Sequence, residues 1–281
     1  MNHKIKNILV TGGGGYIGTN LVRNLLEEGY KVRVIDTFWF GDHLKKNKNL
    51  KILKKDIRNI VEKDLEKIDC ILHLASIAND PAAELDAGLT WDVNVLATYK
   101  LINIAIKKKV KKFIFASSGS VYGIKKEKKV TENLSLEPVS EYNKSKIIGE
   151  RLLLSYKKYI DLVILRPATV CGYSPRQRLD VVVNILTNFA YHKRAITIFG
   201  GKQLRPNIHI NDMAKVYETL IEAPKSKVSG EIFNAGYENH SVLELANTVK
   251  KVIGDDVSLK SSFTNDNRSY HISSKKIKKY K

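Results

Sequence analysis

The stretch Thr11-Gly12-Gly13-Gly14-Gly15-Tyr16-Ile17-Gly18 lies between a short apolar run, Ile5–Val10, and a segment with helical spacing, Tyr16–Glu28. Its glycines follow the pattern G-x-x-G-x-x-G, at Gly12, Gly15 and Gly18. Glycines at this spacing let the backbone approach a pyrophosphate and let the helix pack closely on the strand. The stretch therefore predicts a dinucleotide-binding turn, with the phosphates at the helix N-terminus.

The first half of the chain alternates short apolar runs with segments of helical spacing. The predicted strands are Ile5–Val10, Lys31–Ile35, Leu50–Leu53, Cys70–Leu74, Phe113–Ala116 and Leu162–Leu165. The predicted helices are Tyr16–Glu28, Asn94–Ile106 and Ser145–Tyr156. Strands that alternate with helices form parallel sheets covered on both faces. We therefore predict an α/β fold, a Rossmann-type doubly wound parallel sheet.

The alternation ends after Pro167, where a smaller mixed C-terminal substrate lobe is expected. The predicted elements there are helices at Val181–Ala190, Asp212–Glu222 and Val242–Val252, a polar loop at Gly200–His209 and a late strand at Ile232–Gly236. We predict a Rossmann domain over residues 1–170, rejoined by about residues 207–236, and a substrate-binding lobe over 171–206 and 237–281. The sequence has no repeats and no flexible tether, so the lobes should pack tightly together.

Composition limits the class of protein. The chain has 281 residues, of which 43% are hydrophobic, and it has no uninterrupted apolar run that would span a membrane. The N-terminus, Met1–Lys4, lacks the long apolar region of a secretory signal, which predicts a cytoplasmic protein. Cys70 and Cys171 both lie in apolar runs. We interpret them as buried thiols in a reducing compartment rather than as a disulfide.

The formal net charge of +19 comes mostly from lysines spread along the chain. Short clusters occur at Lys107–Lys112, Lys125–Lys129 and Lys275–Lys281, without the interleaved aromatic residues of single-strand binders or the spacing of a metal knuckle. These lysines are typical of solvated helix ends, so we expect no nucleic-acid partner and no metal. The positive field favours an anionic, diphosphate-bearing substrate.

Asp36 ends the second predicted strand, about twenty residues beyond the glycines. A carboxylate at this point accepts hydrogen bonds from the adenosine ribose and repels a 2′-phosphate, which predicts NAD rather than NADP. Asp56 and Ile57 follow the third predicted strand and are weaker candidates for holding the adenine edge.

Two further motifs carry chemistry. Tyr142-Asn143-Lys144-Ser145-Lys146 has the pattern Y-x-x-x-K, which places the phenol and the ammonium on one face of a helix. A lysine and a nicotinium nearby would lower the pKa of the phenol and make it a usable acid/base group. Ser118, in the stretch Ser117–Gly123, follows the fifth predicted strand, where a hydroxyl points into the ligand crevice.

Taken together, these motifs resemble the NAD-dependent nucleotide-sugar epimerase/dehydratase family of the extended short-chain dehydrogenases/reductases, in particular UDP-glucose 4-epimerases. The motifs, in family order, are Thr11–Gly18, Asp36, Asp56-Ile57, His73-Leu74-Ala75-Ser76, Asn94, Ser117–Gly123, Tyr142–Lys146 and Leu165-Arg166-Pro167. The resemblance implies a Rossmann lobe that binds NAD and a C-terminal lobe that binds a nucleoside-diphosphate sugar. It also implies a homodimer formed through the helices near Asn94–Ile106 and Ser145–Tyr156.

The resemblance assigns roles to individual residues. Tyr142 and Lys146 match the family's acid/base and ribose-binding lysine, and Ser118 matches its catalytic serine or threonine. The implied cofactor contacts are Gly12, Gly15, Tyr16, Ile17, Gly18, Asp36, Asp56, Ile57, Leu74, Ala75, Ser76, Asn94, Tyr142, Lys146 and Pro167. The implied substrate contacts are Ser118, Asn184, Arg205, Arg268, and the two arginines of an SPRxRxD signature, Arg176 and Arg178. Ser273–Ile277 resembles the start of a segment that continues further in the family. The resemblance therefore does not assign the residues that form the outer wall of the substrate pocket.

The residues after Ser118 bear on the reaction. A 4,6-dehydratase of this family usually has an Asp-Glu pair there, whereas this chain has Gly119 and Ser120. We see no cysteine or carboxylate set for 3,5-epimerisation or decarboxylation. The simplest remaining reaction is 4-epimerisation through a transient 4-keto sugar. A C4 dehydrogenase or 4-keto reductase would have the same residues, and a non-enzymatic nucleotide- or RNA-binding module would not need them.

Overall fold

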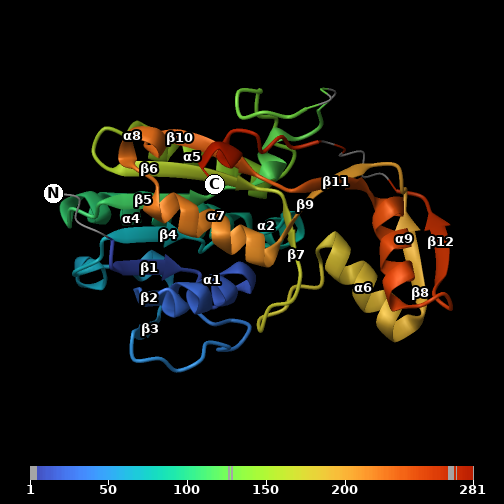
Figure 1. The fold of residues 1–281 in the computed structure, drawn as a ribbon. Helices are drawn as coiled ribbons and strands as arrows, with labels where there is room; N and C mark the ends of the chain where they lie inside the picture. Colours follow the sequence, from blue (N-terminus) through green and yellow to red (C-terminus); the bar gives the residue numbers. More distant parts are fainter. Residues whose placement is uncertain (1–4, 126, 128, 265–268, 270, 281) are drawn as a thin grey trace.

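The computed structural model describes residues 5–125, 127, 129–264, 269 and 271–280. A seven-stranded sheet, with every strand parallel to its neighbours, forms the larger part of the molecule (Figure 1). Its order is β10 (Glu231–Ala235), β6 (Asp161–Pro167), β5 (Lys112–Ala116), β4 (Cys70–His73), β1 (Asn7–Thr11), β2 (Lys31–Asp36) and β3 (Leu50–Lys54). The predicted doubly wound Rossmann-type sheet is confirmed.

Helices cover both faces of this sheet because successive strand residues point to opposite sides. On β1, Ile8 and Val10 belong to one buried cluster and Leu9 to another. The first cluster includes side chains of α1 (Tyr16–Glu27) and α7 (Ile210–Glu222). The second includes side chains of α4 (Ala97–Lys107) and α5 (Glu141–Ser155). The apolar strand runs of the sequence are therefore buried from both sides.

A smaller lobe lies beyond the carboxyl ends of the sheet (Figure 1). Its elements are β7 (Thr169–Cys171), α6 (Val182–Lys193), β8 (Ala195–Phe199), β9 (Leu204–His209), β11 (Glu238–Ser241), α9 (Val242–Ile253) and β12 (Ser258–Ser262). Three strands pair in the order β11-β9-β7, and β8 pairs with β12. A separate cluster joins α6, α9 and β8, including Leu186, Ala246 and Ile196. The short α8 (Lys225–Val228) precedes β10.

The predicted loop at Gly200–His209 is wrong, because residues Leu204–His209 form the strand β9. Pro206 made a strand improbable, since proline cannot donate to a sheet ladder. The structure resolves this conflict because β7 pairs with β9 only from Asn207 onward. At Pro206 the strand has β11 as its one neighbour, so no ladder bond is lost on the other side.

Three other predictions need correction. The helix predicted from Ser145 begins at Glu141, because the Ser140 hydroxyl caps it by accepting a hydrogen bond from the Asn143 N–H. The α-helix predicted from Asn94 begins at Ala97, and Asn94 itself lies in a π-helical turn, Asp92–Leu96. Two unpredicted helices, α2 (Asp80–Leu85) and α3 (Ala87–Trp91), precede this turn. Cys171 is only half-buried, because β7 is an edge strand, whereas Cys70 is fully buried; both are free thiols.

No helix in the described part of the chain has both the length and the apolar character needed to cross a membrane. Within the same residues, no three histidine, cysteine or acidic side chains gather closely enough to hold a metal ion.

Candidate active site

The glycine turn joins β1 to α1 and has no room for side chains at two of its positions. Gly12 has φ of +73°, and a Cβ there would lie 2.6 Å from the backbone nitrogen of Ala75. A Cβ at Gly18 would lie 2.3 Å from the Gly12 carbonyl oxygen. Both glycines are therefore required for the close approach of the turn to its neighbours.

The N-terminus of α1 is open to an anion. Gly15 occupies the cap position, no described side chain caps the helix, and its first turn has no acidic residue. A Cβ at Gly15 would meet a single atom within 4 Å, the Gly12 carbonyl oxygen at 3.2 Å. Free N–H groups and the helix dipole favour a phosphate at such an end. This geometry fits the pyrophosphate of a dinucleotide.

Asp36, at the end of β2, has its carboxylate fixed by two backbone donors. The N–H of Gly14 donates to Oδ2 at 2.9 Å, and the N–H of Phe38 donates to Oδ1 at 2.7 Å. Each oxygen keeps a lone pair for a ribose hydroxyl. Phe38 has φ of +55°, a conformation that is rare for a bulky residue and that lets its N–H turn back to the carboxylate.

The carboxylate of Asp56 is engaged within its own segment. It accepts from the Arg58 backbone at 2.8 Å and from the Arg58 guanidinium at 2.8 Å. The Arg58 side chain holds the pKa of Asp56 below its usual value despite partial burial. Ile57 is buried in the core. The adenine-binding roles of these two residues stay predictions.

The segment after β4 is held by Asn94, which lies in the π-helical turn. Its Oδ1 accepts from the Ser76 hydroxyl at 3.0 Å and from the Ile77 N–H at 2.9 Å. Its Nδ2 donates to the Ser145 hydroxyl at 2.9 Å, which ties this segment to α5. The structure therefore brings the predicted cofactor residues Leu74–Ser76 and the helix of Tyr142 and Lys146 into one unit.

Tyr142 and Lys146 lie one turn apart on α5. The Lys146 Nζ is 5.8 Å from the centroid of the Tyr142 ring and donates to the Ala116 carbonyl at 2.9 Å. Tyr142 is half-buried, whereas the Lys146 side chain is buried. The pattern Y-x-x-x-K therefore brings an ammonium next to a phenol at the carboxyl end of β5.

Burial lowers the pKa of Lys146 to about 7, although the Glu150 carboxylate acts in the opposite direction. A neighbouring imidazole stays uncharged, because burial and the charge of Lys146 lower the pKa of His73 to about 3. His73 lies between the hydroxyls of Thr11, at 2.7 Å, and Thr98, at 2.8 Å. Of these two groups, Lys146 is therefore the one with a pKa near neutral.

Ser118 caps the short 3₁₀ turn Gly119–Tyr122 that follows β5. Its Oγ accepts from the Ser120 N–H at 3.1 Å and lies 2.8 Å from the Ser120 Oγ. The Asn143 side chain donates to that second hydroxyl at 3.0 Å, so the turn is tied to the residue next to Tyr142. A Cβ at Gly119 would lie 2.9 Å from the Pro167 carbonyl oxygen, which brings the predicted nicotinamide neighbour Pro167 to the same place.

A buried ion pair behind Lys146 was not predicted. The Arg166 Nη2 lies 2.6 Å from the Glu150 Oε2, and both side chains are at most 3% exposed. The Ser117 hydroxyl also donates to Glu150, and Arg166 donates to the Tyr122 hydroxyl at 2.8 Å. Although burial opposes its charge, Glu150 raises the pKa of Arg166 above its usual value. The sequence signal was the continued spacing Tyr142, Lys146, Glu150.

The predicted substrate residues fall into separate groups. Arg178 forms a bidentate pair with Asp180, with Nε 2.8 Å from Oδ1. Burial opposes its charge, but Asp180 and, less strongly, Tyr142 raise the pKa of Arg178, which places its guanidinium within electrostatic range of the phenol. Arg176 instead lies over the ring of Phe40.

The other three lie further along the chain. Asn184 is buried, and its Nδ2 donates to the Tyr16 hydroxyl at 3.1 Å. Arg205 is half-buried on β9 and donates to the Leu204 carbonyl at 3.2 Å. Arg268 lies outside the described residues. Their substrate contacts stay predictions.

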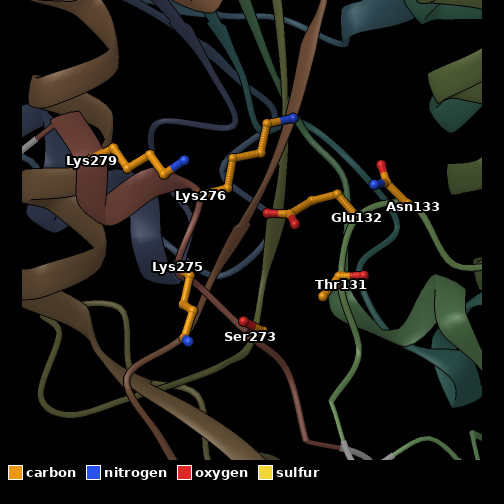
Figure 2. Close-up of a pocket in the computed structure, with 7 residues that line it drawn as sticks. All are labelled: Thr131, Glu132, Asn133, Ser273, Lys275, Lys276 and Lys279. Atoms are coloured by element: carbon orange, nitrogen blue, oxygen red, sulfur yellow. The ribbon is translucent and has the colours of Figure 1, made fainter.

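A cavity elsewhere on the molecule contains none of the predicted site residues (Figure 2). Its lining comprises Thr131, Glu132, Asn133, Ser273, Lys275, Lys276 and Lys279. Lys276 pairs with Glu231 at 2.6 Å, and Glu132 accepts from the Asn234 N–H at 2.9 Å. Lys276 and Glu132 in its lining contact residues of strand β10, and none of the lining residues belongs to the glycine turn.

A Rossmann-type sheet with an open glycine turn, a fixed strand-end carboxylate and a Tyr–Lys pair defines a short-chain dehydrogenase/reductase. Residues 8–236 match the NAD dependent epimerase/dehydratase family, and the chain belongs to that family. NAD is therefore its cofactor, in agreement with the fit of the glycine turn.

Similar proteins include an uncharacterized UDP-glucose epimerase, YtcB, of Bacillus subtilis, which is 35% identical over 90% of this chain and 84% of its own length. A dTDP-D-glucose 4,6-dehydratase of Homo sapiens is 30% identical over 88% of this chain and 74% of its own. The fold is similar to that of a UDP-N-acetylglucosamine 4-epimerase from Methanobrevibacter ruminantium, solved with UDP-N-acetylmuramic acid. That comparison has a TM-score of 0.91 and 27% identity, and covers 99% of this chain and 92% of the other. The chain is thus an enzyme of a family that acts on nucleotide sugars.

Proposed function

We propose that this enzyme is an NAD-dependent epimerase of a nucleoside-diphosphate sugar, and that it inverts C4 through a transient 4-keto intermediate. The observation that carries the proposal is the composition of the turn after β5. Ser118 begins this turn, which a hydrogen bond ties to Asn143, the residue next to Tyr142. The two positions that follow Ser118 are Gly119 and Ser120, which carry no carboxylate. Elimination of water from the sugar needs an additional acid and base, whereas epimerisation at C4 needs only one group that takes up and returns a proton.

In this reaction Tyr142 accepts the proton of the C4 hydroxyl and later returns it. Lys146 stabilises the phenolate, because its ammonium lies 5.8 Å from the phenol ring. Ser118 donates a hydrogen bond to the reacting sugar oxygen, where negative charge develops. NAD, when bound, supplies reversible uptake of the C4 hydrogen. The 4-keto sugar rotates within the site, and the hydrogen returns to the opposite face of C4. The product therefore differs from the substrate at C4 alone.

We further propose that Arg178, Asn184, Arg205 and Arg268 hold the substrate, within a lobe formed by residues 171–206 and 237–281. The UDP-sugar enzymes among the similar proteins support a nucleoside diphosphate as the substrate class.

The test is a panel of UDP-, GDP- and dTDP-sugars, with products identified by NMR. Inversion at C4 without net change in NAD supports the proposal. Stoichiometric NADH without inversion would identify a C4 dehydrogenase, and a 4-keto-6-deoxy product would identify a dehydratase. The Tyr142→Phe variant should lower kcat by about 10²- to 10⁴-fold with little change in KM, because it removes the proton-transfer group. Unchanged turnover would exclude Tyr142 as the acid/base.

We also propose a homodimer that pairs α4 and α5 with their copies. These helices pack side by side, and Tyr99 on α4, Ile148 on α5 and Leu96, at the cap position of α4, are each at least 37% exposed. Apolar side chains gathered on two adjacent helices favour association. Light scattering of the purified protein measures the mass directly, and a monomer at micromolar concentration would contradict the proposal.

A further inference from the structure

The segment Gly172–Asp180 between β7 and α6, here called the strap, is bound tightly to α1. The Tyr16 hydroxyl donates to the Gly172 carbonyl at 2.8 Å, and the Asn20 side chain donates to the Tyr173 carbonyl at 3.0 Å. The buried Ser174 hydroxyl donates to the Tyr16 carbonyl at 2.8 Å. The strap therefore begins beside the N-terminus of α1, where the glycine turn ends (Figure 1).

The other end of the strap is bound to the segment that follows β4. The Arg178 Nη2 donates to the Ala78 carbonyl at 3.0 Å. The Asn79 side chain donates to Asp180 at 3.0 Å. The strap therefore extends from the carboxyl end of β1 to that of β4, which are neighbouring strands. In sheets of this kind a dinucleotide lies across these ends.

A third contact comes from Arg176, in the middle of the strap. Its guanidinium carbon lies 3.9 Å from the centroid of the Phe40 ring, in the segment after β2. Both residues line a cavity with Arg178 and Asp180. The strap therefore contacts the segments that follow β1, β2 and β4. The predicted cofactor residues Gly12–Gly18, Asp36 and Leu74–Ser76 lie at the carboxyl ends of the same three strands.

Arg176 has hydrogen-bonding capacity that the described protein does not use. Its Nε is buried and has no partner among the described residues. Its neighbour Arg178 is already neutralised by the bidentate contact with Asp180. Burial and Arg178 lower the pKa of Arg176, while Asp180 and Asp36 act in the opposite direction, so Arg176 lies within electrostatic range of the ribose-binding carboxylate. Its Nη1 already donates to the Gln177 carbonyl at 3.2 Å, so the buried Nε is the donor that lacks a partner among the described residues. A buried guanidinium donor at this position indicates an anionic ligand.

We propose that Arg176 is a cofactor-binding residue. Held by the strap, it donates to the phosphates of NAD from the side opposite the glycine turn, and its contact with Phe40 must open before the cofactor leaves. This assignment moves Arg176 from the substrate, where the sequence motif suggested it, to the cofactor. It does not depend on which sugar reaction the enzyme performs.

Two consequences separate this role from a purely structural one. Release of NAD requires the contact between Arg176 and Phe40 to open, so both residues should slow dissociation. Only Arg176 should distinguish ligands by their phosphates, because Phe40 carries no charge. Arg176→Ala should therefore weaken ADP-ribose and NAD but leave adenosine unchanged, whereas Phe40→Ala should speed the release of NAD.

The experiment measures NADH release from the purified holoenzyme by fluorescence during a chase with excess NAD. We expect Arg176→Ala to speed release by about tenfold or more, the loss of one charge-assisted contact. Arg176→Lys should recover part of the difference, because it restores the charge without the planar fork. Calorimetry with ADP-ribose and adenosine on NAD-stripped protein gives the second comparison.

Arg23→Ala is the matched control, since Arg23 is an exposed arginine on α1 whose one ion pair in the described chain, with Glu27, is 4.0 Å long. Circular dichroism and the melting temperature verify that each variant folds. Unchanged NADH release in a folded Arg176→Ala variant overturns the proposal. An equal loss of ADP-ribose and adenosine binding also overturns it, because it would indicate a general distortion rather than a phosphate contact. Neither result bears on the C4 reaction, which is followed separately by NMR.

Discussion

Replacing Lys146 with methionine should change how the stability of the NAD-free enzyme depends on pH. The side chain is buried, and burial lowers its pKa to about 7, compared with about 10.4 in an unfolded chain. A lysine whose pKa is lowered in the folded state destabilises that state while both states are protonated. The destabilisation is complete below pH 7 and is relieved as the pH rises toward the unfolded pKa.

The size of the effect follows from the two pKa values. A difference of about three units, at about 1.4 kcal/mol per unit, gives a full cost of about 4 to 5 kcal/mol at low pH. Between about pH 6.5 and about pH 9.5, about 3 kcal/mol of this cost should disappear. Methionine has a similar length and no charge, so its contribution to packing is the same at every pH. The free energy of unfolding of the variant, minus that of the native enzyme, should therefore fall by about 3 kcal/mol over this range.

Urea unfolding of both proteins at intervals across this range measures the difference directly. The bound nucleotide must first be removed and its absence verified, because a ligand of the folded state adds its own pH dependence. Lys144→Met, an exposed lysine on the same helix, is the control for loss of a surface charge. A difference between Lys146→Met and native enzyme that stays constant with pH would refute the reasoning, and so would one that grows.

Two further changes test the groups around this lysine and the glycine turn. Glu150→Gln leaves the buried Arg166 without its carboxylate and should lower the free energy of unfolding, measured in urea, by about 3 to 5 kcal/mol. The double change Glu150→Met with Arg166→Met should recover much of this loss, because it removes both buried charges. A small effect of the single change would contradict the role of the buried pair. Gly18→Ala should weaken NAD binding by about tenfold or more in calorimetry, because its Cβ would lie 2.3 Å from the Gly12 carbonyl. Gly88→Ala, which meets only the Asp86 side chain at 3.4 Å, should bind NAD normally.

The central sheet could be predicted from the sequence because its strands are buried on both faces. Such strands are short apolar runs, and helical spacing between them indicates the crossovers. The strand β10 was also found, since Ile232–Gly236 has the same apolar character. In contrast, β9 depends on β11, which lies about thirty residues further along the chain and is polar. Pairing between distant polar segments leaves no local pattern, so this strand was predicted as a loop.

The cofactor half of the site was more accessible to sequence reasoning than the substrate half. The glycine turn and Asp36 act through backbone geometry at one strand-to-helix connection, and fixed spacings describe such a unit. The strap contacts the segments that follow three different strands of the Rossmann sheet, and it does so through side chains. Nothing near Arg176 in the sequence reveals that Phe40, more than a hundred residues earlier, is its neighbour. The motif therefore predicted a substrate role for Arg176, whereas the contacts of the strap are the basis of the proposed cofactor role.

The helix α5 shows how a spacing can be informative and still be interpreted too narrowly. Tyr142, Lys146 and Glu150 follow one another at intervals of four residues, and each step of four turns the side chain by about 40° around the helix. The three groups therefore do not share one direction. Tyr142 is half-buried at the start of the helix, and Lys146 is directed to the carbonyl of Ala116, the last residue of β5. Glu150 accepts a hydrogen bond from the hydroxyl of Ser117, the residue after that strand.

This rotation explains why Tyr142 is half-buried, whereas the charged groups of Lys146 and Glu150 are both buried. In the proposed reaction Tyr142 meets the substrate, which agrees with its partial exposure. Lys146 has to be charged while buried, which is costly unless an opposite charge lies nearby. Glu150 lies one turn later and acts on Lys146 in that direction, and its carboxylate pairs with the buried Arg166. Because Ala116 and Ser117 lead directly to Ser118, a change at Glu150 alters both the charge beside Tyr142 and the strand end that carries the serine. We therefore expect Glu150 to influence the reaction through two routes, although it touches neither sugar nor cofactor.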